Sequence, residues 1–112
     1  MPALPFETLP LELKRRMEAG ERLRLIDVRE PQEHAVASIS GAELIPMGTV
    51  PARLTHLEAQ ADADVLIVFC HHGVRSLQVV NWLREQGIEN CQSLAGGIDR
   101  WAAEVDAAVP RY

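Results

Sequence analysis

A cysteine followed by a short basic loop is the part of this sequence best suited to chemistry. Five apolar residues, 65–69, end at Cys70, and a polar loop containing Gly73 and Arg75 follows. The amphipathic segment 77–84 then predicts a helix. Cys70 is therefore expected between a strand and a helix N-terminus, where unpaired N–H groups, the helix dipole and Arg75 all favour the thiolate.

The same loop is also suited to binding an anion. If the N–H groups of residues 71–76 converge, they form a nest for a thiolate or for a charged group that the thiolate acquires. We therefore expect Cys70 to be the nucleophile. The residues expected to form the active-site loop and bind substrate are His71, His72, Gly73, Val74, Arg75 and Ser76.

The elements that must position this loop alternate between helix and strand. Helices are predicted over residues 10–19, 31–36, 51–60, 77–84 and 98–105, and strands over 23–28, 42–45, 65–69 and 91–94. This alternation predicts an α/β protein with a parallel sheet covered by helices on both faces. Ligands bind beyond the carboxyl ends of such strands. Asp27, Cys70 and Gly96 each follow a predicted strand, so we expect them to share one edge.

Four residues at that edge are expected to support the loop. Asp27 either anchors the loop or caps a strand end, and its position favours neither alternative. Arg29 is one turn from Glu33, which predicts a structural ion pair. Gly96 and Gly97 are expected to let the backbone pass close to the loop.

Composition limits the remaining classes of function. A chain of 112 residues with 47% hydrophobic and 24% charged residues predicts one globular domain, residues 1–112. The net charge is −5, and the basic run at residues 14–16 is short, so nucleic acid is not expected as a partner. No apolar run is long enough to cross a membrane. Residues 1–5 lack signal-peptide features, and two cysteines make no disulfide framework, so a cytoplasmic location is expected.

The histidines and the second cysteine carry simpler interpretations. Cys70, His71 and His72 are adjacent, so they cannot easily converge on one ion, and no spaced second pair of ligands follows. We therefore expect no metal. Cys91 lies inside a predicted strand without basic neighbours, which is typical of a small buried hydrophobic residue.

In their order and spacing, five segments resemble the rhodanese-like sulfurtransferases in their single-domain form. These segments are residues 25–31 with Glu33, 39–42, 45–46, 68–76 and 94–101. The resemblance implies a five-stranded parallel sheet flanked by helices, with a very short strand near Phe6 at one edge. Ser38 and Ser40 stand where the family often has His and Pro, a difference that bears on substrate fit and leaves the fold unchanged.

The resemblance implies sulfur transfer through a persulfide on Cys70, without a dissociable cofactor. The thiolate would take sulfur from a donor such as thiosulfate and pass it to cyanide or a thiol, while Arg75 attracts the anionic donor and pins the loop. One alternative is a persulfide carrier that docks a donor or acceptor protein, for example in cofactor or tRNA thiolation. A non-catalytic interaction module is a weaker alternative. The sequence leaves open the natural donor and acceptor, the oligomeric state, the orientation of His71 and His72, and whether the tail 108–112 docks a partner.

Loop length argues against phosphatase activity. Dual-specificity phosphatases of the cell-cycle type have a similar fold and five residues between cysteine and arginine, enough for a tetrahedral oxyanion. Four residues separate Cys70 from Arg75 here. The smaller cradle suits a single sulfur atom better than a phosphate.

Overall fold

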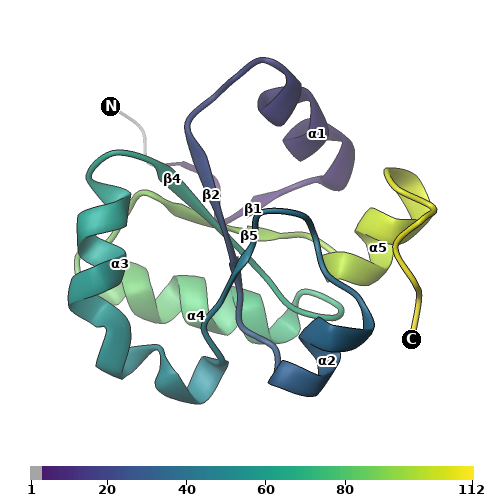
Figure 1. Cartoon of the computed structure of the whole chain (residues 1–112). Coiled ribbons are helices and arrows are strands. Elements are labelled where there is room, and N and C mark those ends of the chain that lie inside the picture. Colours follow the sequence, from purple (N-terminus) through teal and green to yellow (C-terminus); the bar gives the residue numbers. More distant parts are fainter. Residues whose placement is uncertain (1–3) are drawn as a thin grey trace.

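Five parallel strands form one sheet at the centre of the structure (Figure 1). The computed structural model describes residues 4–112, so the first three residues of the predicted domain lie outside the described part. The strands are β1 (Glu7–Thr8), β2 (Leu23–Asp27), β3 (Glu43–Leu44), β4 (Val65–Phe69) and β5 (Cys91–Leu94), in the order β1-β5-β4-β2-β3. This sheet confirms the predicted fold class, and β1 is the short edge strand expected near Phe6.

Helices cover both faces of the sheet. They are α1 (Pro10–Glu18), α2 (Pro31–Val36), α3 (Leu54–Ala61), α4 (Val74–Glu85) and α5 (Gly97–Glu104). One hydrophobic cluster joins the sheet to α3 and α4, through residues such as Leu57 and Val80. The other cluster joins it to α1 and α5, through residues such as Leu13 and Ile98. Figure 1 shows these two pairs of helices on opposite sides of the strands.

The local differences from the predicted elements have identifiable causes. The helix expected at 77–84 begins three residues earlier, because Gly73 has φ of 96° and serves as the left-handed N-cap of α4. The helix expected over 51–60 begins as a 3₁₀ turn, Pro51–Arg53, after another at Met47–Thr49. The strand expected over 42–45 is reduced to the two residues of β3, since Pro46 stops it.

The central strand β4 determines where Cys70 lies. Leu66 and Val68 belong to one hydrophobic cluster, whereas Ile67 and Phe69 belong to the other. Because successive side chains of a strand point to opposite faces, a strand buried on both sides is apolar throughout. Pairing with β2 on one side and β5 on the other holds Cys70 at the carboxyl edge of the sheet.

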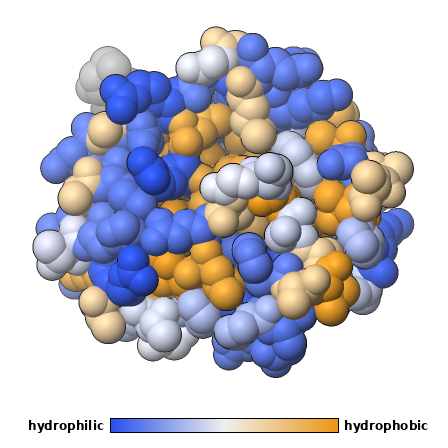
Figure 2. Space-filling model, in the orientation of Figure 1, coloured by the Kyte–Doolittle hydropathy of each residue, from blue (hydrophilic) through white to orange (hydrophobic). Residues whose placement is uncertain are grey.

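The surface mixes polar and apolar side chains. On the face drawn in Figure 2, hydrophilic residues predominate and hydrophobic atoms appear between them in small groups. Among the large hydrophobic side chains that are exposed, Val36, Val74 and Tyr112 belong to α2, α4 and the C-terminal tail. No helix within residues 4–112 combines the length and the apolar character that crossing a membrane requires.

Candidate active site

The loop after β4 wraps around the sulfur of Cys70. Backbone N–H groups of Gly73 and Ser76 donate to Sγ at 3.1 and 3.3 Å. These two donors make up part of the nest expected from residues 71–76. The Cys70 residue is only 1% exposed, so its sulfur lies in a largely dehydrated environment where such hydrogen bonds are strengthened.

Two buried serines extend the hydrogen bonding of the sulfur. The Cys70 thiol donates to Ser76 Oγ at 3.3 Å, and Ser76 Oγ lies 2.7 Å from Ser93 Oγ. Both serines are fully buried. In a thiolate state the hydroxyls can rotate, so that Ser93 donates to Ser76 and Ser76 donates to the sulfur.

Sequence reasoning missed Ser93, which lies in β5. The available signal was a hydroxyl residue within a short strand that is otherwise buried. A buried hydroxyl requires a partner, and the carboxyl edge of a parallel sheet is where a partner with chemical function would lie.

The backbone at the start of α5 is hydrogen-bonded to the loop that follows β4. Ile98 and Asp99 donate their N–H groups to the carbonyl oxygens of Cys70 and His71 at 2.9 and 3.1 Å. A Cβ on Gly97 would overlap both of these oxygens. The glycine therefore permits the close approach that its sequence position predicts.

Asp27 and Arg29 form a buried ion pair next to this loop. The Asp27 carboxylate accepts hydrogen bonds from Arg29 Nε at 2.9 Å and Nη2 at 2.7 Å, and neither side chain is exposed. His34 Nδ1 lies 2.8 Å from the same carboxylate. Burial opposes the charge of Arg29, but its bonds with Asp27 and Tyr112 prevail and raise the pKa of Arg29 above its ordinary value.

The predicted ion pair between Arg29 and Glu33 is wrong. Arg29 reaches only the backbone carbonyl of Glu33, at 3.3 Å, because its guanidinium is already paired with Asp27. The guanidinium also donates to the carbonyl of Ala37 at 2.6 Å. Asp27 was expected either to anchor a loop or to cap a strand end. The geometry favours an anchor, and the segment that Asp27 anchors is the one that follows β2.

Glu33 instead binds Arg75 of the active-site loop. Arg75 Nη1 and Nη2 donate to Glu33 Oε1 and Oε2 at 2.8 and 3.0 Å. The hydrogen bonds from Arg75 lower the pKa of Glu33 to about 2, although burial opposes this shift. The same pairing raises the pKa of Arg75. Arg75 therefore pins the loop to α2, whereas its expected attraction for an anionic donor is weakened by the carboxylate already bound to it.

Tyr112 joins α2 to the active-site loop. Its hydroxyl accepts from Arg29 Nη1 at 2.7 Å and donates to Glu33 Oε2 at 2.8 Å. Its ring stacks on His71, with centroids 3.9 Å apart and planes 6° apart. Burial raises the pKa of Tyr112, so the hydroxyl keeps its proton. Sequence reasoning missed this contact, because the tail 108–112 has no periodic pattern.

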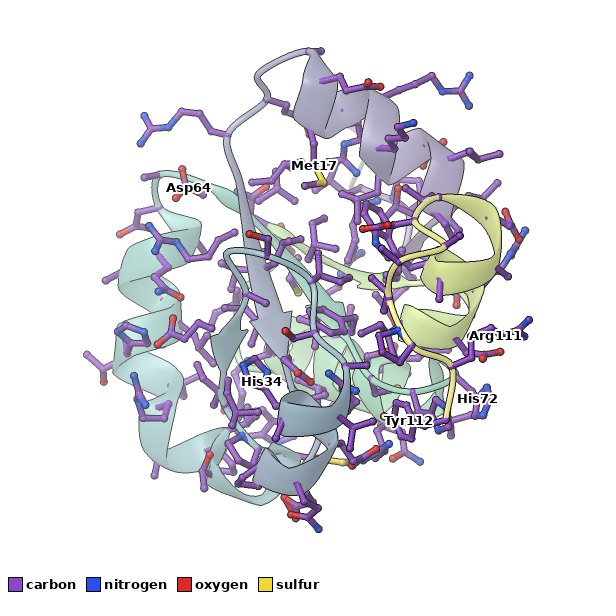
Figure 3. All side chains as sticks on the ribbon, turned by 45° about the vertical axis from the view of Figure 1, so that its right-hand side comes forward. Met17, His34, Asp64, His72, Arg111 and Tyr112 are labelled. Atoms are coloured by element: carbon purple, nitrogen blue, oxygen red, sulfur yellow. The ribbon has the colours of Figure 1, made fainter. Side chains whose placement is uncertain are left out.

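The two loop histidines have different environments. His71 lies between the rings of His72 and Tyr112, and its Nε2 is buried without a hydrogen-bond partner among the described residues. Burial and the neighbouring His72 lower the pKa of His71, so its ring is mainly neutral near pH 7. His72 is exposed, and Figure 3 shows it beside Tyr112 and Arg111 at the surface.

The second cysteine lies in the core, as predicted. Cys91 is fully buried in β5, and burial raises the pKa of its thiol against the opposing effect of Arg84. Both cysteines are free thiols. Within residues 4–112 no three His, Cys, Asp or Glu side chains are grouped in a way that could hold a metal ion.

A cysteine at the end of a central parallel strand, bound by N–H groups of the following helix, defines an α/β domain with a thiol-centred site. The chain belongs to the rhodanese-like domain family, whose model matches residues 9–104. Its members include sulfurtransferases, so the family resemblance of the sequence is confirmed.

Individual relatives agree with this assignment. A putative sulfurtransferase of Bacillus subtilis, YtwF, is 41% identical over 93 residues, which cover 82% of this chain and 85% of that protein. The solved human single-domain sulfurtransferase TSTD1 is 28% identical with a TM-score of 0.76, and the match covers 90% of this chain and 98% of that one. The maize adenylyltransferase and sulfurtransferase MOCS3-2 is 34% identical over 90% of this chain.

Several of these relatives are much longer proteins. The chain spans 22% of the length of MOCS3-2 and 31% of a chloroplastic rhodanese-like protein of Arabidopsis thaliana. Similarity to these relatives therefore concerns one domain of each.

Proposed function

We propose that this protein is a sulfurtransferase that holds a sulfane sulfur as a persulfide on Cys70. The observation that carries the proposal is the binding of Cys70 Sγ by the N–H groups of Gly73 and Ser76, in a loop with only four residues between Cys70 and Arg75. In the first half-reaction the Cys70 thiolate attacks the outer sulfur of a donor such as thiosulfate. The sulfur–sulfur bond of the donor breaks, sulfite leaves with the electron pair, and Cys70 carries the persulfide anion.

Backbone donors supply the stabilisation that the persulfide needs. The first intrahelical bond of α4 runs from the N–H of Leu77 to the carbonyl of Gly73, at 3.2 Å. The earlier N–H groups of Val74 and Arg75 therefore face the helix N-terminus without an intrahelical acceptor. We assign these two groups to the outer sulfur, by the same logic as an oxyanion hole.

The second half-reaction regenerates the thiolate. An acceptor thiolate or cyanide attacks the outer sulfur, and Cys70 leaves as the thiolate, so the cycle needs no dissociable cofactor. A reducing compartment such as the cytoplasm would keep Cys70 available between cycles.

Intact mass spectrometry after incubation with thiosulfate tests the proposal. We expect a gain of one sulfur atom that cyanide removes, that Cys70→Ser abolishes, and that the matched control Cys91→Ser retains. The same samples should be incubated with glutathione persulfide as a second donor. A sulfur gain in Cys70→Ser, or none in the wild type with either donor, would contradict a Cys70 persulfide.

A second candidate is a persulfide carrier loaded by another protein. The guanidinium groups of Arg29, Arg75 and Arg111 are all bonded to carboxylates. A thiosulfate dianion therefore meets cations whose charge is already balanced, whereas a protein persulfide carries less charge and depends less on them. Faster loading of Cys70 from a protein persulfide than from thiosulfate would favour the carrier, and the reverse order would exclude it.

The third interpretation, a non-catalytic interaction module, makes a separate prediction. In that case Cys70→Ser would leave the cellular role of the protein intact. Loss of that role in Cys70→Ser, with the protein still folded, would reject the interaction module.

A further inference from the structure

The C-terminal tail, residues 108–112, follows α5 and reaches α2. Figure 1 shows the tail running back along α5 toward α2, and Figure 3 shows Arg111 and Tyr112 beside His72. Arg111 binds Asp99 through two hydrogen bonds of 2.9 and 3.0 Å. Val109 packs against the hydrophobic cluster on the α5 side of the sheet. The tail is therefore attached at several points before it reaches the site.

Tyr112 is where the tail meets the active-site loop. Its hydroxyl bonds with Arg29 and Glu33 on the α2 side, and its ring stacks on His71 on the loop side. The Tyr112 side chain thus connects the segment around α2 with the loop after β4, which are far apart in the sequence.

The closed arrangement leaves the nucleophile almost inaccessible. Cys70 is 1% exposed, and Nε2 of the neighbouring His71 is buried without a partner among residues 4–112. A sulfur donor must approach Sγ in line with the bond that breaks, so part of the surroundings has to move.

The loop itself is poorly suited to that movement. Its carbonyls at Cys70 and His71 are bonded to the backbone of α5, and Gly97 packs directly against them. The tail is held differently, by side chains that remain partly in solvent. Arg111 has 60% of its side chain exposed, and Tyr112 is 42% exposed. Contacts of this kind open more readily than a packed backbone.

We propose that Tyr112 is a specificity-determining residue that limits access to Cys70 by the size of the incoming molecule. While its ring lies on His71, small movements of the surrounding side chains admit only small molecules to the sulfur. When the tail swings away, bulky thiols and persulfides reach it as well. The inference rests on the proposed function only in taking Cys70 as the reactive thiol.

Alkylation by two maleimides of different size tests this inference. N-ethylmaleimide and polyethylene glycol maleimide share one chemistry, so the ratio of their rates at Cys70 reports steric access. The variants are Tyr112→Ala, which removes the ring and the hydroxyl, and Tyr112→Phe, which keeps the ring. Phe6→Ala is the matched control, because Phe6 is an aromatic residue of similar exposure, 48%, that lies under Arg84 just before the edge strand β1.

We expect Tyr112→Ala to raise the rate at which polyethylene glycol maleimide alkylates Cys70 by about tenfold or more. The reason is that a ring stack and two hydrogen bonds to charged groups are lost. The rate with N-ethylmaleimide should change by less than about twofold, because a small reagent is hardly restricted by the ring. Tyr112→Phe should lie between Tyr112→Ala and the wild type, and Phe6→Ala should match the wild type. Intact mass assigns each adduct to Cys70 by its loss in Cys70→Ser.

Two results would overturn the inference. An equal increase in the alkylation rates of both reagents in Tyr112→Ala would mean that the loop has loosened as a whole. Tyr112 would then be a structural residue. No acceleration of the large reagent would mean that Tyr112 does not restrict access. Alkylation needs no sulfur donor, so this outcome is independent of whether Cys70 forms a persulfide.

Discussion

The ion pair between Glu33 and Arg75 should make the stability of the protein depend on pH in a defined way. Its two hydrogen bonds lower the pKa of Glu33 from 4.5 to about 2. At about 1.4 kcal/mol per pKa unit, this difference corresponds to roughly 3 kcal/mol as an upper bound. Because 35% of the Arg75 side chain is exposed, solvent screening reduces the expected contribution to about 1–2 kcal/mol.

The sign of the effect follows from the direction of the pKa shift. The pKa of Glu33 is lower in the folded state, so its stabilisation is complete above about pH 4.5 and disappears as the pH falls to about 2. We therefore expect Glu33→Gln to reduce the free energy of unfolding by about 1–2 kcal/mol at pH 7 and to have little effect near pH 2. Urea unfolding at both pH values, followed by the fluorescence of Trp82 and Trp101, measures the difference.

A double-mutant cycle separates the ion pair from other effects of the substitution. Arg75→Gln combined with Glu33→Gln should cost less than the sum of the two single variants, because the interaction can be lost only once. Additive losses, or an equal loss for Glu33→Gln at pH 7 and near pH 2, would refute the reasoning. The glutamine would then be destabilising through its packing.

Three further predictions concern the packing around the site and are tested by urea unfolding. Gly97→Ala should cost more than about 2 kcal/mol, because its Cβ would overlap two carbonyl oxygens, whereas Gly48→Ala, with no described atom within 4 Å of its Cβ, should cost less than about 1 kcal/mol. Asp27→Asn leaves a buried guanidinium without its anion and should cost about 3–5 kcal/mol, and a loss below about 1 kcal/mol would contradict the pair. Ser76→Ala leaves the Ser93 hydroxyl buried and unpaired and should cost about 1–3 kcal/mol, and adding Ser93→Ala should recover part of that loss.

The position of Cys70 could be predicted because its signals are local. The run of five apolar residues indicates a buried strand, and the polar loop before the amphipathic segment 77–84 indicates that a helix follows. Parallel strands align their carboxyl ends, so the common edge of Asp27, Cys70 and Gly96 followed from the alternation of elements. The order of the strands did not follow, since pairing such as that between β1 and β5 joins segments more than eighty residues apart.

The contacts that the sequence analysis predicted wrongly or missed are those between side chains brought together by the tertiary structure. Arg29 has carboxylates two and four residues away, and spacing favoured Glu33, whereas burial selected Asp27. Tyr112 reaches α2 from a tail with no regular pattern, and Ser93 meets Ser76 across two elements. Local periodicity carries no information about contacts of this kind.

The central position of β4 has a consequence for motion. Both edges of β4 are hydrogen-bonded, to β2 and to β5, so its amides can exchange with solvent only when the sheet opens. Hydrogen exchange should therefore be slowest in Leu66 and Val68 and fastest in the tail that carries Tyr112. Cys70 is attached to the most persistent part of the molecule, whereas the tail proposed to control access to it lies at the periphery.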